Sequence, residues 1–265
     1  MEVSTGFAEA DGARLYYEVA GSGPAVILIP AQSLDTRMWD DQFLAFAESH
    51  RVVRYDVRAC GQSSGSNEDD FSYYDDLKVL MDHLNIDKAS LIGVSLGGGI
   101  ALNFAILHPE SVSGLILVDT YFNAIGHWPQ MTPLIQELVS IAKKSGPEKA
   151  KEFWMQLPWF TAALEKPDVA ARLAEMVADY PGHFAGKGGH DWSKPWASDH
   201  LDEIKTPTLV IVGERDTSDN RAVTDFLSEQ ISGARKSVMK GVGHIANMED
   251  PRLFNEIVLE FLADM

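Results

Sequence analysis

Two kinds of hydrophobic pattern alternate along most of this chain. Short runs rich in Val, Ile and Leu, bounded by Gly or Pro, are typical of strands buried on both faces of a sheet. Between them, apolar residues recur every three or four positions, as in a helix with one buried face. Strands are predicted at residues 14–19, 25–29, 51–55, 89–94, 112–118, 208–212 and 236–239, and helices at 39–46, 74–84, 96–107, 222–231 and 251–261. This alternation predicts an α/β fold with a mostly parallel central sheet and helices on both faces.

The alternation stops between residues 121 and 200. In this stretch three helical patterns follow one another, at residues 134–141, 153–157 and 169–180, with no strand pattern between them. Such a block is expected where a helical cap is inserted into an α/β domain. The predicted domains are therefore a core of residues 1–120 and 201–265 and a helical cap of residues 121–200.

Size, charge and cysteine content narrow the class of protein. The 265 residues suffice for one large core. With 22 Lys and Arg against 39 Asp and Glu, the net charge is −17 and no basic stripe is present, so neither nucleic acid nor an anionic membrane is an expected partner. Neither a secretory leader nor a membrane-spanning run is recognised in the sequence, which predicts a cytoplasmic protein. The lone Cys60 forms no internal disulfide, and no metal site is expected.

The most informative motif is Gly-Val-Ser-Leu-Gly at residues 93–97. It joins a buried strand that ends at Val94 to a helical pattern that begins at Leu96. A catalytic serine requires this placement, because a sharp strand-to-helix turn lifts the hydroxyl out of the backbone and flanking glycines let the two arms approach. Ser95 is therefore the candidate nucleophile.

A serine hydroxyl needs a base within hydrogen-bond reach and an acid that orients that base. Asp216 follows the predicted strand at residues 208–212, and His244 follows the one at 236–239. The carboxyl ends of parallel strands share one edge of a sheet, so these residues are able to converge with Ser95.

Four segments together resemble the α/β-hydrolase fold superfamily, and the resemblance covers nearly the whole chain. They are a nucleophile elbow at residues 92–98, an acid loop at 212–216, a histidine loop at 243–244 and the segment at 54–63, which is similar to the family's Asp-x-Arg-Gly-x-Gly-x-Ser. The resemblance implies that Ser95 is the nucleophile, His244 the general base and then acid, and Asp216 the residue that orients His244. Haloalkane dehalogenases share the fold but carry aspartate at the position of Ser95.

The sequence departs from the family pattern at two loops. Where many relatives carry His-Gly after the second predicted strand, this chain has Pro30 and Ala31. By alignment with the family, the backbone N–H groups of Gln32 and Leu96 are the expected oxyanion-hole donors, but Ala31 resists the positive φ of glycine, so a different loop path is expected. Ala59 also stands where the family usually has glycine, and only a structural effect is expected there.

Two assignments leave alternatives open. Asp119 also follows a strand, and some family branches draw their acid from that position, although the loop before Asp216 matches the commoner arrangement. The stretch from 121 to 200 is rich in aromatic residues, which predicts an apolar acyl pocket. The equally simple alternative is that these rings only hold the cap together. The candidate pocket residues are Trp128, Trp154, Trp159 and Phe184.

The resulting hypothesis is a cofactor-free serine hydrolase. It would cleave a small, fairly apolar carboxylic ester or lactone through an acyl-enzyme, and its partner would be that small molecule. Within the same family resemblance, cofactor-free oxygenases, perhydrolases and hydroxynitrile lyases use similar residues. The fold therefore does not determine which reaction is catalysed. A receptor-like binder that retains the hydrolase fold is the alternative from a different class.

Overall fold

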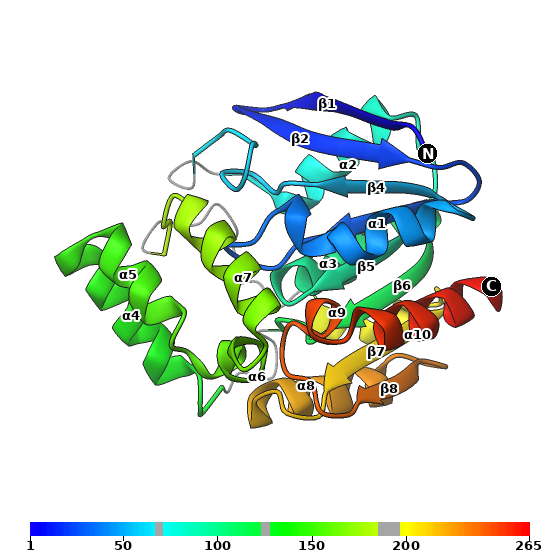
Figure 1. Cartoon of the computed structure of the whole chain (residues 1–265). Helices are drawn as coiled ribbons and strands as arrows, with labels where there is room; N and C mark the ends of the chain where they lie inside the picture. Colours follow the sequence, from blue (N-terminus) through cyan, green and yellow to red (C-terminus); the bar gives the residue numbers. More distant parts are fainter. Residues whose placement is uncertain (67–70, 123–127, 185–196) are drawn as a thin grey trace.

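The computed structural model describes residues 1–66, 71–122, 128–184 and 197–265. Within these residues an eight-stranded sheet runs through the molecule in the order β1-β2-β4-β3-β5-β6-β7-β8 (Figure 1). β1 pairs with β2 and β2 with β4 in antiparallel fashion, and all other neighbours are parallel. The prediction of a mostly parallel α/β sheet is confirmed. The strands are β1 (Val3–Ala10), β2 (Ala13–Ala20), β3 (Ala25–Ile29), β4 (Arg51–Tyr55), β5 (Ala89–Val94), β6 (Val112–Val118), β7 (Thr208–Gly213) and β8 (Arg235–Met239).

The sequence pattern misses β1 altogether. Most of its residues are exposed or only partly buried, and Ala8 is the one fully buried position in it. An edge strand with so few buried side chains lacks the apolar run that marks the central strands. Its pairing with β2, from Val3 opposite Ala20 to Ala10 opposite Ala13, extends the sheet away from the candidate site.

The helices cover both faces of the sheet. In Figure 1, α1 and α10 lie together in front of the strands, while α2 and α3 pack against each other behind them. The helices of this core are α1 (Asp40–Ala47), α2 (Tyr73–His83), α3 (Leu96–Leu107), α8 (Ser218–Gln230), α9 (Ala246–Glu249) and α10 (Pro251–Ala263).

Local chemistry explains where several helices begin and end. Ser72 caps α2, and Asp250 caps α10 by accepting from Leu253 N at 3.1 Å, with Pro251 in the first position as predicted. α3 ends at Leu107, because the proline that follows His108 disfavours helical geometry there. α8 begins at Ser218, four residues before the predicted start, because its first turn is polar and carries no apolar signal.

Four further helices lie beside one end of the sheet, between β6 and β7 in the sequence (Figure 1). We call them the α4–α7 segment. They are amphipathic, and proline stands in the first turn of three of them. The division of the chain into core and cap domains stays a prediction. The helices of the segment are α4 (Thr132–Ser145), α5 (Pro147–Trp154), α6 (Thr161–Leu164) and α7 (Pro167–Asp179).

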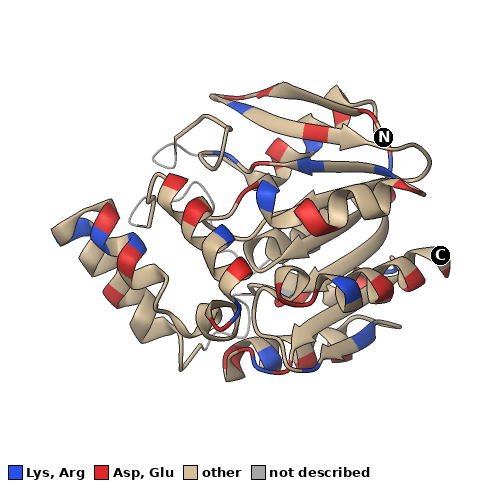
Figure 2. Ribbon diagram, in the orientation of Figure 1, with Lys and Arg blue, Asp and Glu red and all other residues tan. Residues whose placement is uncertain are grey.

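The strand order places a topological switch at β3 and β5. The chain continues from β3 to β4 on one side and then returns to form β5 on the other side of β3. Loops that leave two such strands diverge and open a crevice, which is where ligands bind in open α/β sheets. Charged residues are absent from β3, β5, β6 and β7, which Figure 2 shows in tan at the middle of the molecule. In the described part of the chain, no helix is both long and apolar enough to cross a membrane.

Candidate active site

Ser95 occupies a strained turn between β5 and α3. Its φ is 53° and its ψ −112°, a conformation that side chains rarely adopt. Hydrogen bonds from Ser95 N to Val118 O at 2.9 Å and from Gly99 N to Ser95 O at 3.1 Å hold it there. A Cβ on Gly93 would lie 2.1 Å from Gly97 O, so the elbow can close only with glycine at that position. The predicted elbow geometry is therefore present.

His244 sits on a loop that a buried glutamate holds on both sides. Glu249 accepts from Gly243 N at 2.7 Å through Oε2 and from Ile245 N at 3.1 Å through Oε1. Burial raises the pKa of Glu249, and the two N–H groups oppose that shift by favouring the charged form. In addition, Lys166 of the α4–α7 segment donates to Glu249 O. No sequence motif marks Glu249 as a support of the site.

His244 and Asp216 form a buried hydrogen-bonded pair. Asp216 follows β7, and its Oδ2 lies 2.8 Å from Nδ1 of His244; the two residues are 3% and 5% exposed. Thr217 N donates to Asp216 Oδ1 at 2.6 Å. Burial alone would raise the pKa of Asp216, but the His244 ring and the hydrogen bonds outweigh it and lower that pKa. Asp216 is thus an ionised acceptor for the Nδ1–H of His244.

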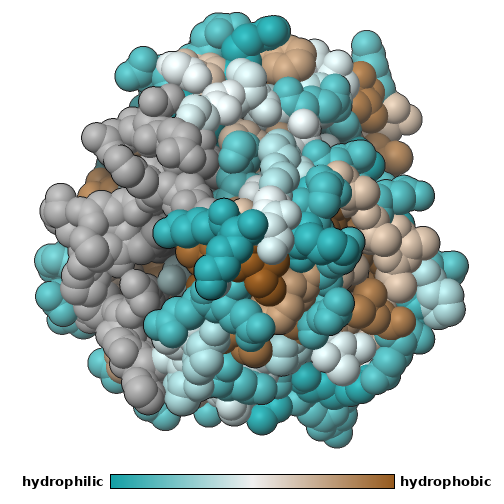
Figure 3. Space-filling view, turned by 90° about the vertical axis from the view of Figure 1, so that its left-hand side faces the viewer, coloured by the Kyte–Doolittle hydropathy of each residue, from teal (hydrophilic) through white to brown (hydrophobic). Residues whose placement is uncertain are grey.

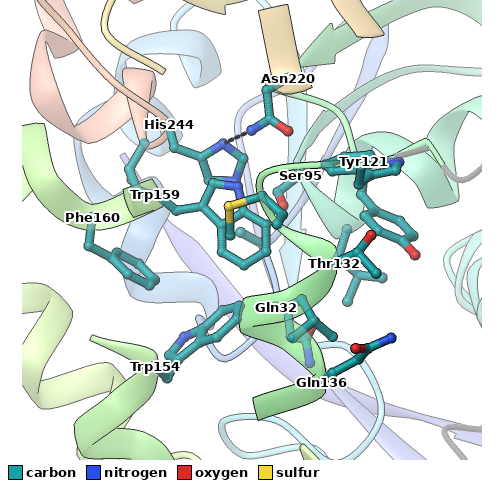
Figure 4. A pocket seen from close by; sticks show the side chains of 16 residues that line it. Gln32, Ser95, Tyr121, Thr132, Gln136, Trp154, Trp159, Phe160, Asn220 and His244 are labelled. Carbon is teal, nitrogen blue, oxygen red and sulfur yellow. Dashed lines mark hydrogen bonds between the residues drawn. The ribbon is translucent and has the colours of Figure 1, made fainter. Parts of the chain in front are cut away.

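Ser95 lies on the other side of the imidazole. Figure 4 shows Nε2 of His244 on the edge of the ring that faces Ser95, and both side chains line the same cavity. The structure shows no hydrogen bond between these two described side chains. Such bonds often tighten only when substrate binds. The three residues predicted from distant parts of the sequence are brought together.

Asn220 is a further residue of this cluster, and no sequence motif marks it. It is 1% exposed, and its Nδ2 donates to Asp216 Oδ2 at 2.7 Å. The same nitrogen lies 2.7 Å from Nδ1 of His244, as the dashed line in Figure 4 marks. The only signal in the sequence was its spacing of four residues from Asp216 at the start of a helix.

Asp119, the alternative acid, lies beside Asp216 and does not hydrogen bond to His244. Its Oδ1 accepts from Gly213 N at 3.0 Å. Among the described residues, one group of acidic and histidine side chains is close enough together to share a metal ion. It consists of Asp119, Asp216 and His244. Nδ1 of His244 is already hydrogen bonded to Asp216, and this bond explains why those two side chains lie close together.

The loop after β3 places no positive φ on Ala31. The positive φ falls on Ser33, at 66°. Trp154 of the α4–α7 segment donates through Nε1 to Ser33 Oγ at 2.8 Å, which fixes the turn. Gln32 and Leu96 both line the cavity, and no acceptor is found for either backbone N–H within the described chain. Elsewhere, Ala59 adopts a φ of 59°, the value that the family's glycine would take easily.

The cavity has a volume of about 290 Å³ and is mainly apolar. Trp154, Trp159 and Phe160 form an aromatic wall in Figure 4, and Trp128 also lines the cavity. Trp159 stacks on His244, with ring centroids 5.6 Å apart. Besides His244, the described lining contains no ionisable side chain except the Tyr121 phenol. The other lining residues are Ala31, Gln32, Ser95, Leu96, Met131, Thr132, Ile135, Gln136, Asn220 and Ile245.

One predicted pocket residue lies elsewhere. Phe184 is not among the residues that line the cavity; its ring packs behind Trp154, at a centroid distance of 5.4 Å, and against Tyr180. Phe184 supports the aromatic wall from outside, so the alternative of a packing role describes it better.

On the outer surface, Figure 3 shows hydrophobic residues between hydrophilic ones on the side that faces the viewer.

Comparison with known proteins adds to this geometry. A family model described as "alpha/beta hydrolase fold" matches residues 24–251. 3-Oxoadipate enol-lactonase 2 of Acinetobacter baylyi is 29% identical over 261 residues, which cover 94% of this chain and 93% of the relative. A Bacillus subtilis relative, 27% identical with 97% of both chains covered, carries the name of a 2-succinyl-6-hydroxy-2,4-cyclohexadiene-1-carboxylate synthase. The crystal structure of an enol-lactonase from Burkholderia xenovorans LB400 superposes with a TM-score of 0.82 at 25% identity, over 97% of this chain and 100% of that one.

Proposed function

This chain belongs to the α/β-hydrolase fold family, and from that premise we propose that it is a serine hydrolase of small, uncharged carboxylic esters or lactones. The observation that carries the proposal is the meeting of Ser95, His244 and Asp216 at one apolar cavity. A relative and a structural neighbour that are named as enol-lactonases support the ester and lactone class. No cofactor is needed for this reaction.

In the proposed mechanism Ser95 is the nucleophile, His244 transfers the protons and Asp216 orients His244. Nε2 of His244 takes the proton from Ser95 Oγ, which attacks the carbonyl carbon of the ester. Asp216 keeps the proton on Nδ1 and stabilises the imidazolium that forms. His244 then protonates the leaving alkoxide, and the acyl group stays on Ser95. Water, deprotonated by His244, attacks the acyl-enzyme and releases the carboxylic acid.

Negative charge develops on the carbonyl oxygen in the transition state, and hydrogen-bond donors are needed to stabilise it. The backbone N–H groups of Gln32 and Leu96, which have no acceptor among the described residues, are the proposed oxyanion hole, as the resemblance implied. Leu96 N lies at the start of α3, where the helix dipole also favours negative charge. Removal of one such donor typically slows turnover about 10²- to 10³-fold.

The lining of the cavity supports the substrate class. Aromatic and aliphatic side chains suit a fairly apolar acyl or alcohol group, whereas a charged substrate would lose its hydration without gaining a counter-ion from the described lining. We propose that the α4–α7 segment, within the predicted cap of residues 121–200, closes this pocket over the core of residues 1–120 and 201–265.

Covalent labelling tests the proposal directly. A fluorophosphonate is expected to modify Ser95, and Ser95→Ala is expected to lose both labelling and about 10⁴- to 10⁶-fold in kcat on p-nitrophenyl esters. Ser90→Ala is the matched control, because Ser90 lies on the same strand but bonds to Ser113 at 3.0 Å, away from the cavity. A folded protein that is not labelled would instead be a receptor-like binder.

The pH dependence of the reaction adds a second check. The lowered pKa of Asp216 keeps this acid ionised throughout the neutral range. The fall of kcat/KM on the acid side should therefore come from protonation of His244, which removes the base. A kcat/KM that rises as the pH is lowered would contradict the proposed role of His244 as a base.

The synthase relative favours a second candidate, a non-hydrolytic reaction of the lyase type on the same three residues. Labelling of Ser95 would not separate the two, but product analysis would. Esters and lactones that are cleaved with one water consumed per turnover support hydrolysis. Substrates that are converted without uptake of water support the second candidate.

A further inference from the structure

Two acidic side chains lie next to each other beneath His244. Asp119 follows β6 and Asp216 follows the adjacent strand β7, and their carboxylate atoms lie with a ring nitrogen of His244 within 4.8 Å of one another. Asp119 is 0% exposed and Asp216 3%. Two buried carboxylates at this separation do not both stay ionised, because like charges repel strongly where water does not screen them. One of the two therefore holds a proton.

The surroundings decide which acid holds the proton. Asp216 accepts hydrogen bonds from Thr217 N, Asn220 Nδ2 and His244 Nδ1. Asp119 accepts from Gly213 N alone within the described residues. Burial and the charge of Asp216 raise the pKa of Asp119 well above its usual range, while the pKa of Asp216 is lowered. These surroundings favour Asp119 as the acid that holds the proton.

The free oxygen of Asp119 has one suitable neighbour. Oδ1 is occupied by Gly213 N, whereas Oδ2 is buried and accepts no hydrogen bond from the described residues. A protonated carboxyl group is a donor, and the carboxylate of Asp216 is the acceptor that faces it. The backbone reinforces the arrangement, because Asp119 takes a positive φ of 44° and its N donates to Ile211 O at 2.9 Å.

We propose that Asp119 is a positioning residue, a neutral carboxylic acid that donates a hydrogen bond through Oδ2 to the Asp216 carboxylate and so orients Asp216 toward His244. The inference deepens the proposed function and rests on it for its catalytic consequence. Asp119 touches neither the cavity nor the reacting atoms. It acts through Asp216, which it helps to keep ionised and in line with Nδ1 of His244.

Two substitutions separate a neutral donor from a charged acid. Asp119→Asn keeps the shape, stays uncharged, accepts from Gly213 N through its carbonyl and donates to Asp216 through its amide. Asp119→Ala removes the donor. Loss of a hydrogen bond to a charged group corresponds to a rate loss of about 10- to 100-fold, so Asp119→Ala should fall in that range while Asp119→Asn stays within about threefold of the unmodified enzyme.

Infrared spectroscopy locates the proton without any assay of activity. The difference spectrum between the unmodified protein and Asp119→Asn near pH 7 should contain the C=O band of a buried carboxylic acid, shifted in D₂O. Asp219→Asn is the matched control, since Asp219 accepts from the N–H groups of Gln130 and Met131 and should lose a carboxylate band instead.

The outcomes are distinct. The proposal is supported if the carboxylic-acid band is present, the Asp119→Asn enzyme keeps nearly the unmodified rate and the Asp119→Ala enzyme is about 10- to 100-fold slower. A carboxylate band from Asp119, an Asp119→Asn enzyme as slow as Asp119→Ala, or an Asp119→Ala enzyme as fast as the unmodified one would overturn it. If Ser95 is not labelled yet the acid band is present, the proposed hydrolase function fails while the position of the proton stands.

Discussion

The two sides of the cavity are built from different kinds of contact. On the core side, Ser95, Asp216 and His244 stand on loops held by backbone hydrogen bonds and buried carboxylates. The side formed by the α4–α7 segment consists largely of aromatic rings, among them Trp154 and Trp159. Directional contacts leave one arrangement of the core side, whereas apolar packing accepts several shapes of comparable energy.

Ion pairs near the protein surface contribute to the contacts between the α4–α7 segment and the core. Besides the hydrogen bonds of Trp154 and Lys166 described above, Arg215 pairs with Glu165 and Arg172 with Asp41 across the boundary, and the side chains of these two ion pairs are 29–54% exposed. Exposed ion pairs contribute little to stability because water screens them. We therefore expect changes on the core side to abolish activity and changes on the segment side to alter which substrates bind. Four substitutions, taken in order of decreasing effect, test this contrast.

The strongest effect is expected from Gly97→Ala in the elbow. A Cβ there would lie 2.2 Å from Ile29 O, a backbone atom that cannot rotate away, so the loop after β3 must move. Overpacking of this kind costs about 1–3 kcal/mol or more, and displacement of an oxyanion donor slows turnover about 10²- to 10³-fold. Thermal melts and kcat measure the two effects.

Gly146→Ala is the control for Gly97→Ala on the segment side. Gly146 has a positive φ of 84°, whereas Gly97 is helical, but nothing lies within 4 Å of a Cβ added at Gly146. Only the cost of the backbone conformation remains, about 1–3 kcal/mol at φ 84° and ψ 175°, and kcat should be unchanged. A Gly97→Ala enzyme with normal kcat would show that the elbow is less constrained than its contacts indicate.

The next largest effect is expected from Glu249→Ala. This change leaves Gly243 N and Ile245 N without their acceptor on both sides of His244, and each unsatisfied buried donor costs about 1–3 kcal/mol. We expect a lower Tm and a kcat reduced about 10-fold or more, because the imidazole is no longer held in place. The KM should change little.

Glu165→Ala provides the matched control for Glu249→Ala. Glu165 is a glutamate of the α4–α7 segment whose carboxylate meets Arg215 in an exposed pair. Neither Tm nor kcat should change measurably. Equal effects of the two glutamate substitutions would remove the contrast between the two sides of the cavity.

A smaller and more selective effect is expected from Trp159→Leu. The ring stacks on His244 and lines the cavity, so its loss removes an aromatic contact worth about 0.5–1.5 kcal/mol, or up to about 10-fold in kcat/KM. The loss should grow with the length of the acyl chain across a series of p-nitrophenyl esters. Trp128→Leu, which changes a lining ring not stacked on His244, should alter KM and leave kcat unchanged.

The smallest effect is expected from Trp154→Phe. It keeps an aromatic ring but deletes the bond from Nε1 to Ser33 Oγ, which should lower kcat/KM by about fivefold. Ser33→Ala should do the same. If both act through this one bond, the double variant should be no slower than either single variant. Additive losses would mean that the two residues act independently.

Much of the fold could be predicted because its signals are local. The runs Ala25–Ile29 and Ala89–Val94 are buried on both faces of the sheet, so nearly every residue in them is apolar. The hairpin strand β1 and the early start of α8 were missed for the opposite reason. Their exposed or polar residues carry no hydrophobic period, and tertiary contacts alone define them.

The candidate site was predictable to the extent that its residues follow strands. The placement of Ser95, Asp216 and His244 after parallel strands was enough to expect their convergence. Asn220 and Glu249 were not predicted, because an amide or a carboxylate on an ordinary helix has no motif. Phe184 was misplaced, since a ring that lines a cavity and a ring packed behind it look alike in a sequence.

Local sequence patterns were enough to locate the central strands, the serine elbow, and the acids and histidine that could act with that serine. These depend on side-chain chemistry and on neighbours along the chain. Tertiary contacts were needed to show that Asp216 faces His244 while Asp119 lies beside Asp216, and that the positive φ after β3 falls on Ser33. Those outcomes depend on where adjacent strands end and on which buried groups meet there, and no local pattern records either.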